Sequence, residues 1–129
     1  MRPRVMYSRV GVEAGLGTLE EARRATAAVF HALRDRLVPN EADQAAAQLP
    51  RELKVLWYEA SPPGVARAKT HVREFLERVK DEGGLADVRT AGLVTDAVFA
   101  ALKDQISTGE SDDILAQLPR DLKRVWLHA

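Results

Sequence analysis

The sequence lacks several features that define large classes of protein. Its 129 residues include no cysteine, which excludes disulfides, thiolate zinc sites, iron–sulfur clusters and a cysteine nucleophile. It contains no apolar run of about 18 residues, so we expect no membrane-spanning helix. The basic residues near the N-terminus are not followed by an apolar segment. We therefore expect no secretory signal and a cytoplasmic location.

An excess of charge of one sign is also missing. Nineteen Lys and Arg residues balance nineteen Asp and Glu residues, and aromatic residues make up only 5% of the chain. A net charge of zero provides no general attraction to nucleic acid or to an anionic membrane, so neither is favoured as a partner. With 46% hydrophobic residues, the composition instead indicates a soluble globular protein with a substantial core.

The chain contains an internal repeat. Residues 1–60 align with residues 70–129 without a gap, and 25 of the 60 aligned positions are identical. The clearest block, AQLPRELK at residues 47–54, recurs as AQLPRDLK at residues 116–123. A gapless match of this length indicates a duplication of one structural unit.

The repeat predicts the domain organisation. We expect a single domain over residues 1–129, with one repeat unit at 1–60, a linker at 61–69 and a second unit at 70–129. The linker begins with Ser-Pro-Pro-Gly, which interrupts a helix. Because a 60-residue unit is only marginally stable by itself, the two units are expected to share one core about an approximate two-fold axis.

The hydrophobic residues recur with the period of an α-helix. One face of a helix is formed by Val72, Phe75, Leu76 and Val79, spaced i, i+3, i+4 and i+7. Gly15 and Gly84 are placed to end the first helix of each unit. Thr18 and Asp87 are placed to cap the second and longest helix, and Thr18 is followed by the Glu of a capping box.

Two further helices complete each unit. A short third helix is predicted near residues 41–48 and again near 110–117, and Pro50 and Pro119 mark the start of the fourth. The fourth helices have these inward-facing positions: Leu53, Leu56 and Trp57, then Leu122, Val125 and Trp126. Alternating strand-like segments are short. The predicted fold class is all-α, with about eight helices arranged as two pseudo-symmetric four-helix units packed on a shared core.

The residue types that commonly carry catalysis are not grouped in the sequence. His31, His71 and His128 have no histidine counterpart in the other unit, and we expect them to be solvated or to cap helices. The acidic cluster of Glu110, Asp112 and Asp113 lacks the spacing of a calcium loop, and it is expected to offset the positive end of a helix. No serine occurs in a Gly-x-Ser-x-Gly context. The sequence therefore predicts no catalytic residue, no cofactor and no metal site, and the protein is not expected to be an enzyme.

The repeated basic pair is the main candidate binding feature. Arg51 and Lys54 lie three residues apart, on one face of the fourth helix, and Arg120 and Lys123 repeat them in the second unit. If the two-fold axis brings the fourth helices together, these four cations would form one patch for phosphate or for an acidic partner. The alternative is a solvated helix face.

The repeated segments resemble a known family. The pattern Ala-Val-Phe-x-Ala-Leu in the second helix, followed by Gln-Leu-Pro-x-x-Leu at residues 48–53 and 117–122, is similar to that of the bacterial domain-of-unknown-function 2267 family. The resemblance covers nearly the whole chain and both repeat units. It implies a small, duplicated, helical bacterial protein, and it implies no activity and no catalytic residue.

Three hypotheses for function follow from these features. The first is a non-enzymatic interaction or scaffolding module that binds a protein partner, or a second copy of the chain, through a helical face. The second is anion or nucleic-acid binding through Arg51, Lys54, Arg120 and Lys123. The third is a small-ligand or enzyme site in a cleft between the two repeats.

Overall fold

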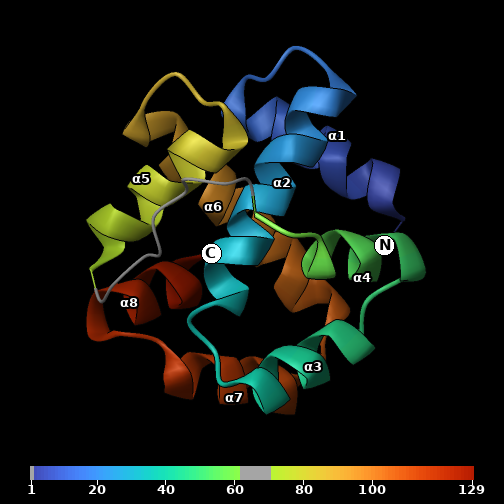
Figure 1. The fold of residues 1–129 in the computed structure, drawn as a ribbon, viewed down its shortest axis with the longest axis vertical. Helices are drawn as coiled ribbons and strands as arrows, with labels where there is room; N and C mark the ends of the chain where they lie inside the picture. Colours follow the sequence, from blue (N-terminus) through green and yellow to red (C-terminus); the bar gives the residue numbers. More distant parts are fainter. Residues whose placement is uncertain (1, 62–70) are drawn as a thin grey trace.

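The computed structural model describes residues 2–61 and 71–129, and the regular elements in these residues are all helices (Figure 1). They are α1 (Pro3–Ala14), α2 (Leu19–Arg34), α3 (Pro39–Ala47), α4 (Arg51–Tyr58), α5 (Val72–Gly83), α6 (Val88–Gln105), α7 (Thr108–Gln117) and α8 (Arg120–His128). The prediction of an all-α fold with about eight helices is confirmed for this part of the chain. The predicted linker, apart from Ser61, and the first residue of the second unit lie outside the described residues.

The two long helices begin at the predicted caps. The Thr18 hydroxyl accepts a hydrogen bond from the Glu21 N–H at 3.0 Å, and the Asp87 carboxylate accepts one from the Thr90 N–H at 2.8 Å. The Glu21 carboxylate reaches back to the N–H of Gly17 at 3.2 Å, one residue earlier than in a standard capping box. Each bond satisfies a backbone donor near the start of a helix.

The first helix of each half ends at a glycine, as predicted. Gly15 has φ 69° and Gly84 has φ 64°, a left-handed conformation that side chains with a Cβ disfavour. The N–H of the next residue, Leu16 or Leu85, donates to a carbonyl of the preceding helix, Gly11 or Lys80. These turns reverse the chain so that the first two helices of each half pack together.

The third helices begin two residues earlier than predicted. α3 starts at Pro39, which fits there because the first residues of a helix have no use for a backbone N–H. α7 starts at Thr108, and the Ser107 hydroxyl caps it by accepting from the Glu110 N–H at 3.1 Å. Pro50 and Pro119 lie immediately before α4 and α8, so the predicted starts of the fourth helices are confirmed.

The core is continuous across the two halves of the chain. α2 and α6 lie at the centre and contact each other, α1 packs against both, and α5 packs against both as well (Figure 1). The largest side chains that are less than 2% exposed come from both halves: Trp57, Phe30, Met6, Leu33, Leu53 and Leu56, and Trp126, Phe75, Phe99, Leu102, Ile114 and Leu122. Phe30 contacts Trp57 with ring centroids 5.4 Å apart, and Phe99 contacts Trp126 at 5.0 Å.

The shorter helices close the ends and sides of this core. α3 lies against α7 at the lower end of the molecule in Figure 1. α4 packs against α2 and α3, whereas α8 packs against α6 and α7, so α4 and α8 lie on opposite sides (Figure 1). None of the helices in the described residues is both long and apolar enough to cross a membrane.

Candidate functional site

The four predicted cations are divided between two surfaces. Arg51 and Lys54 lie together on α4, and Arg120 and Lys123 lie together on α8. Both arginines are exposed and both lysines are partly exposed. Because α4 and α8 are on opposite sides of the molecule (Figure 1), the condition for a single four-cation patch is not met. What remains of this prediction is two separate basic pairs.

Arg120 of the second basic pair borders a shallow hollow of about 580 Å³ beside α8. It is lined by His71, Pro119, Arg120, Asp121 and Arg124. The Asp121 carboxylate accepts a hydrogen bond from the Val72 N–H at 2.9 Å and lies 3.9 Å from Nδ1 of His71. The hollow therefore combines two guanidinium groups with a carboxylate, and it is not a purely cationic site.

Of the two predicted roles for His31, solvation is wrong, whereas its contact with the Leu56 carbonyl in the last turn of α4 fits the capping role. The His31 side chain is 3% exposed and joins two parts of the core. Its Nε2 lies 2.8 Å from the Leu56 carbonyl oxygen, which can only accept, so Nε2 carries a hydrogen. Nδ1 lies 3.1 Å from both carboxylate oxygens of Glu82, which is 4% exposed. Glu82 comes from α5, and the pairing is therefore visible only in three dimensions.

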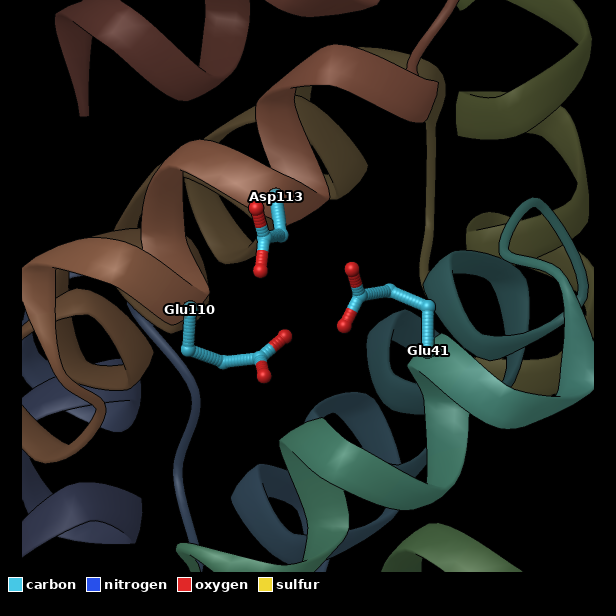
Figure 2. Close-up of side chains that lie close together, drawn as sticks. All are labelled: Glu41, Glu110 and Asp113. Carbon is cyan, nitrogen blue, oxygen red and sulfur yellow. The ribbon is translucent and has the colours of Figure 1, made fainter.

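A second set of buried carboxyl groups lies between α3 and α7. Glu41 on α3 and Glu110 and Asp113 on α7 point toward one another (Figure 2). One carboxylate oxygen of each residue lies within 4.8 Å of the others. Glu41 is 7% exposed and Glu110 is 5% exposed, whereas Asp113 lies at the exposed edge. We call these three residues the seam carboxylates.

The environment of the seam carboxylates disfavours negative charge. Burial, together with the adjacent Glu41 and Asp113 carboxyl groups, raises the pKa of Glu110 to about 7. A proton held between Glu41 and Glu110 relieves the repulsion, and a bound cation would relieve it in the same way. The arrangement can therefore take up a positive charge at neutral pH.

The acidic residues that meet in the structure differ from those that are adjacent in the sequence. The sequence suggests a different group. It joins Glu110, Asp112 and Asp113, which are neighbours in the chain, whereas the structure replaces Asp112 with Glu41 from the other half. Glu41 and Glu110 occupy equivalent positions in the repeat. This equivalence was a usable signal, because in the two-fold arrangement that the sequence predicts a residue close to the axis would meet its own counterpart.

A second hollow, of about 390 Å³, lies where the two halves meet at the opposite end from α3 and α7. The turns at Gly15 and Gly84 form part of its wall, together with Glu21, Arg24 and Thr90. Nε of Arg24 donates to the Glu82 carbonyl oxygen at 3.0 Å, so the principal cation of this wall is tied to α5.

Comparison with known protein families gives one match. Residues 5–125 match the family described as an uncharacterized conserved protein, DUF2267. The chain belongs to this family. No curated protein matches the sequence. Membership of the DUF2267 family thus agrees with the resemblance noted in the repeated segments, and it carries no assigned activity.

Proposed function

We propose that this DUF2267 protein is a non-enzymatic helical module for protein interaction or scaffolding. The observation that carries the proposal is the structural use of its polar side chains. His31 bonds Leu56 and Glu82, Ser107 caps α7, and Thr26 donates to its own helix at the Ala22 carbonyl oxygen, 2.7 Å away. These three side chains, each of a type that could serve as a base or a nucleophile, are engaged in holding helices in place.

We also propose that the molecule consists of two pseudo-symmetric four-helix units, residues 1–60 and 70–129, in one duplicated domain. Every helix of the second half begins 69 residues after its counterpart in the first. Contacts between the halves are reciprocal, because α1 packs on α6 while α5 packs on α2. Reciprocity of this kind is the pattern of a two-fold interface.

Side-chain contacts between the halves support the same proposal. Arg9 pairs with Asp104 at 3.2 Å, and the equivalent residues, Arg78 and Asp35, pair at 2.8 Å. Burial raises the pKa of the Asp35 carboxyl, but hydrogen bonds from Arg78 and Arg34 outweigh burial and hold the pKa below its usual value. This pair, in which Arg78 is buried and Asp35 half-buried, is therefore present in its charged form.

A second reciprocal set joins the ends of the third helices. The Gln48 side-chain oxygen accepts from the Ser107 N–H at 2.6 Å, and the Gln117 side-chain oxygen accepts from the Val38 N–H at 2.9 Å. Val38 and Ser107 are counterparts in the repeat, as are Gln48 and Gln117. The Gln of the Gln-Leu-Pro segment thus holds the start of the opposite third helix, which gives this family-like segment a structural role.

The outer faces of α4 and α8 are the surfaces we favour for partners. Val55 and Tyr58 on α4 are 58% and 52% exposed, and Leu127 on α8 is 61% exposed. Each lies on the same helix as an exposed arginine, Arg51 or Arg120. A partner with apolar and acidic side chains fits such a face, and two faces on opposite sides would allow the module to join two partners.

The test compares partner capture by three single variants. Tagged protein is incubated with lysate of the source organism, and captured proteins are quantified by mass spectrometry. Val55→Glu and Leu127→Glu are expected to reduce capture of a specific protein by about tenfold or more. Val12→Glu, on the exposed face of α1, is the matched control and should retain it. A monomer by light scattering that captures no protein above background would contradict the proposal.

Anion binding is the alternative function, favoured by Arg120 and Arg124 at the hollow beside α8. A short oligonucleotide and inorganic polyphosphate are titrated at low and high salt. The alternative requires binding that weakens with salt and is lost when Arg120 and Arg124 are both changed to Glu. Absence of binding at low salt removes this function. The bacterial origin and the cytoplasmic location implied by the sequence stay as predictions.

A further inference from the structure

We propose that Glu41, Glu110 and Asp113 bind a divalent cation of the oxygen-preferring class, such as Ca²⁺ or Mn²⁺, between α3 and α7. The site would draw its ligands from both halves of the chain. It goes beyond the proposed interaction function and does not depend on it.

The spacing of the carboxylates fits a cation of this size. One oxygen from each of the three residues lies within 4.8 Å of the others. Protein oxygens bind Ca²⁺ at about 2.3–2.6 Å, so two oxygens on opposite sides of the ion are separated by about 4.6–5.2 Å. A cation can thus contact all three residues with little movement of their side chains.

The burial of the two glutamates is a separate observation that points to a ligand. Glu41 and Glu110 are more than nine-tenths buried, and Oε2 of each is enclosed with no hydrogen-bond partner among the described residues. Both side chains point into the space between α3 and α7 (Figure 2). Buried polar atoms are nearly always satisfied, and an unsatisfied carboxylate oxygen is especially costly.

The protein supplies no internal cation to these groups in the part of the chain described. The ion pairs formed by residues 2–61 and 71–129 include none of the seam carboxylates. A proton or a bound ion would balance the negative charge of these groups.

The exposed position of Asp113 gives the ion a route to the site. Its carboxylate lies at the surface, whereas Glu41 and Glu110 lie behind it. Water molecules at this open side would complete the coordination shell, since Ca²⁺ takes about six to eight oxygen ligands and three carboxylates provide at most six. Asp113 has Gln44 as its counterpart in the first half, so the site would be asymmetric.

A bound cation would connect the two halves through α3 and α7. Because it binds the folded state, it would raise the unfolding temperature, and the rise would grow with the logarithm of the free cation concentration above Kd. The glutamates lie where the third helices of the two halves meet. The cation would therefore stabilise the arrangement of the halves as well as each helix.

The test uses the full-length protein, freed of metal with EDTA and dialysed at a pH of about 8. CaCl₂, MnCl₂ and MgCl₂ are titrated separately by calorimetry, and thermal unfolding is followed with and without each salt. We expect one site per chain for at least one cation and a rise in Tm of several degrees at saturation. Mn²⁺ binding should also change the electron paramagnetic resonance spectrum of the bound ion, which reports ligation directly.

The variants separate a specific site from general attraction to acidic residues. Glu41→Gln and Glu110→Gln keep the size of the side chain, and each should lower the affinity by about tenfold or more. Asp112→Asn is the matched control, because Asp112 is an exposed carboxylate on α7 next to Asp113, and its affinity should stay within about twofold of the wild type. The proposal is overturned if no cation binds, or if both Gln variants remain folded by circular dichroism and bind as the wild type does.

Discussion

At the scale of single residues, the seam carboxylates are the feature whose energetics depend most on solution conditions. The Glu110 carboxyl has its pKa raised from 4.5 to about 7 in the folded protein. The folded state therefore binds more protons than the unfolded state between these values. The contribution of the Glu110 carboxyl to the stability of the folded state is fully present below a pH of about 4.5 and is lost as the pH rises through about 7.

Substitution of Glu110 by Gln should remove this pH dependence. With EDTA present, we expect the wild type to lose stability between about pH 5 and about pH 8, whereas Glu110→Gln should lose less. At about pH 8 the variant should be more stable by about 1–3 kcal/mol. Urea unfolding at several pH values measures the difference. If the free energy of unfolding changed with pH as steeply in the variant as in the wild type, the raised pKa of Glu110 would be disproved.

The two tryptophans provide a second prediction at this scale. Trp57 and Trp126 are less than 2% exposed, and Trp126 donates from Nε1 to the Ser111 hydroxyl at 3.2 Å. Replacing either residue by Ala should cost about 3–5 kcal/mol, because it leaves a large cavity. The free energy of unfolding in urea is the measurement. A loss below about 1 kcal/mol at either position would mean that this tryptophan does not anchor the core.

At the scale of helices, the turns after α1 and α5 look alike but have different surroundings. Both end at a glycine with positive φ. A Cβ added to Gly15 has open space around it, with no atom of the described residues within 4 Å, whereas a Cβ added to Gly84 would meet the Arg24 guanidinium. The same guanidinium donates to the Glu82 carbonyl oxygen at 3.0 Å.

Alanine substitution at the two turns should therefore have unequal effects. Gly15→Ala should cost about 1 kcal/mol from the backbone conformation alone. Gly84→Ala also displaces Arg24 and breaks its hydrogen bond. We therefore expect this variant to lose about 2–3 kcal/mol of its free energy of unfolding. Thermal and urea unfolding of the two variants provide a matched comparison. Equal losses of stability in the two variants would show that Arg24 moves aside without lowering the free energy of unfolding.

At the scale of the whole molecule, the continuous core predicts cooperative unfolding. Trp57 reports on the first half and Trp126 on the second, so Trp57→Phe and Trp126→Phe each leave one fluorescent reporter. In each variant, the fluorescence midpoint in urea should coincide with the helix signal from circular dichroism. Trp126→Phe should be the less stable variant by about 1 kcal/mol, because it loses the hydrogen bond to Ser111. Separate midpoints within one variant would show that the halves unfold independently.

The local structure of this protein could be predicted to a large extent from its sequence. The caps at Thr18 and Asp87 and the turns at Gly15 and Gly84 were identified because each depends on side-chain chemistry within four residues. The starts of α3 and α7 were misplaced by two residues. At those positions a proline and a serine cap are compatible both with the start of a helix and with a break before a later start, so the residues alone do not fix the boundary.

The candidate sites show the limit of that approach. The basic pairs on α4 and α8 were found by their spacing, but their separation on opposite sides of the molecule depends on how the helices pack (Figure 1). The pairing of His31 with Glu82 and the meeting of Glu41 with Glu110 join residues 51 and 69 positions apart in the chain. Spacing along one helix contains no information about either pair.

The amino-acid sequence alone determined that the chain is helical, where most helices begin and end, and which face of each is apolar, because these properties arise from interactions within a few residues. Only the tertiary structure decided which polar side chains are buried together. That outcome depends on the reciprocal packing of α1 on α6 and α5 on α2, which sets the distance between groups that are remote in the chain. As a result of this packing, the glutamate at the start of α7 lies at the centre of a buried acidic site, whereas its position in the sequence suggests that it faces solvent.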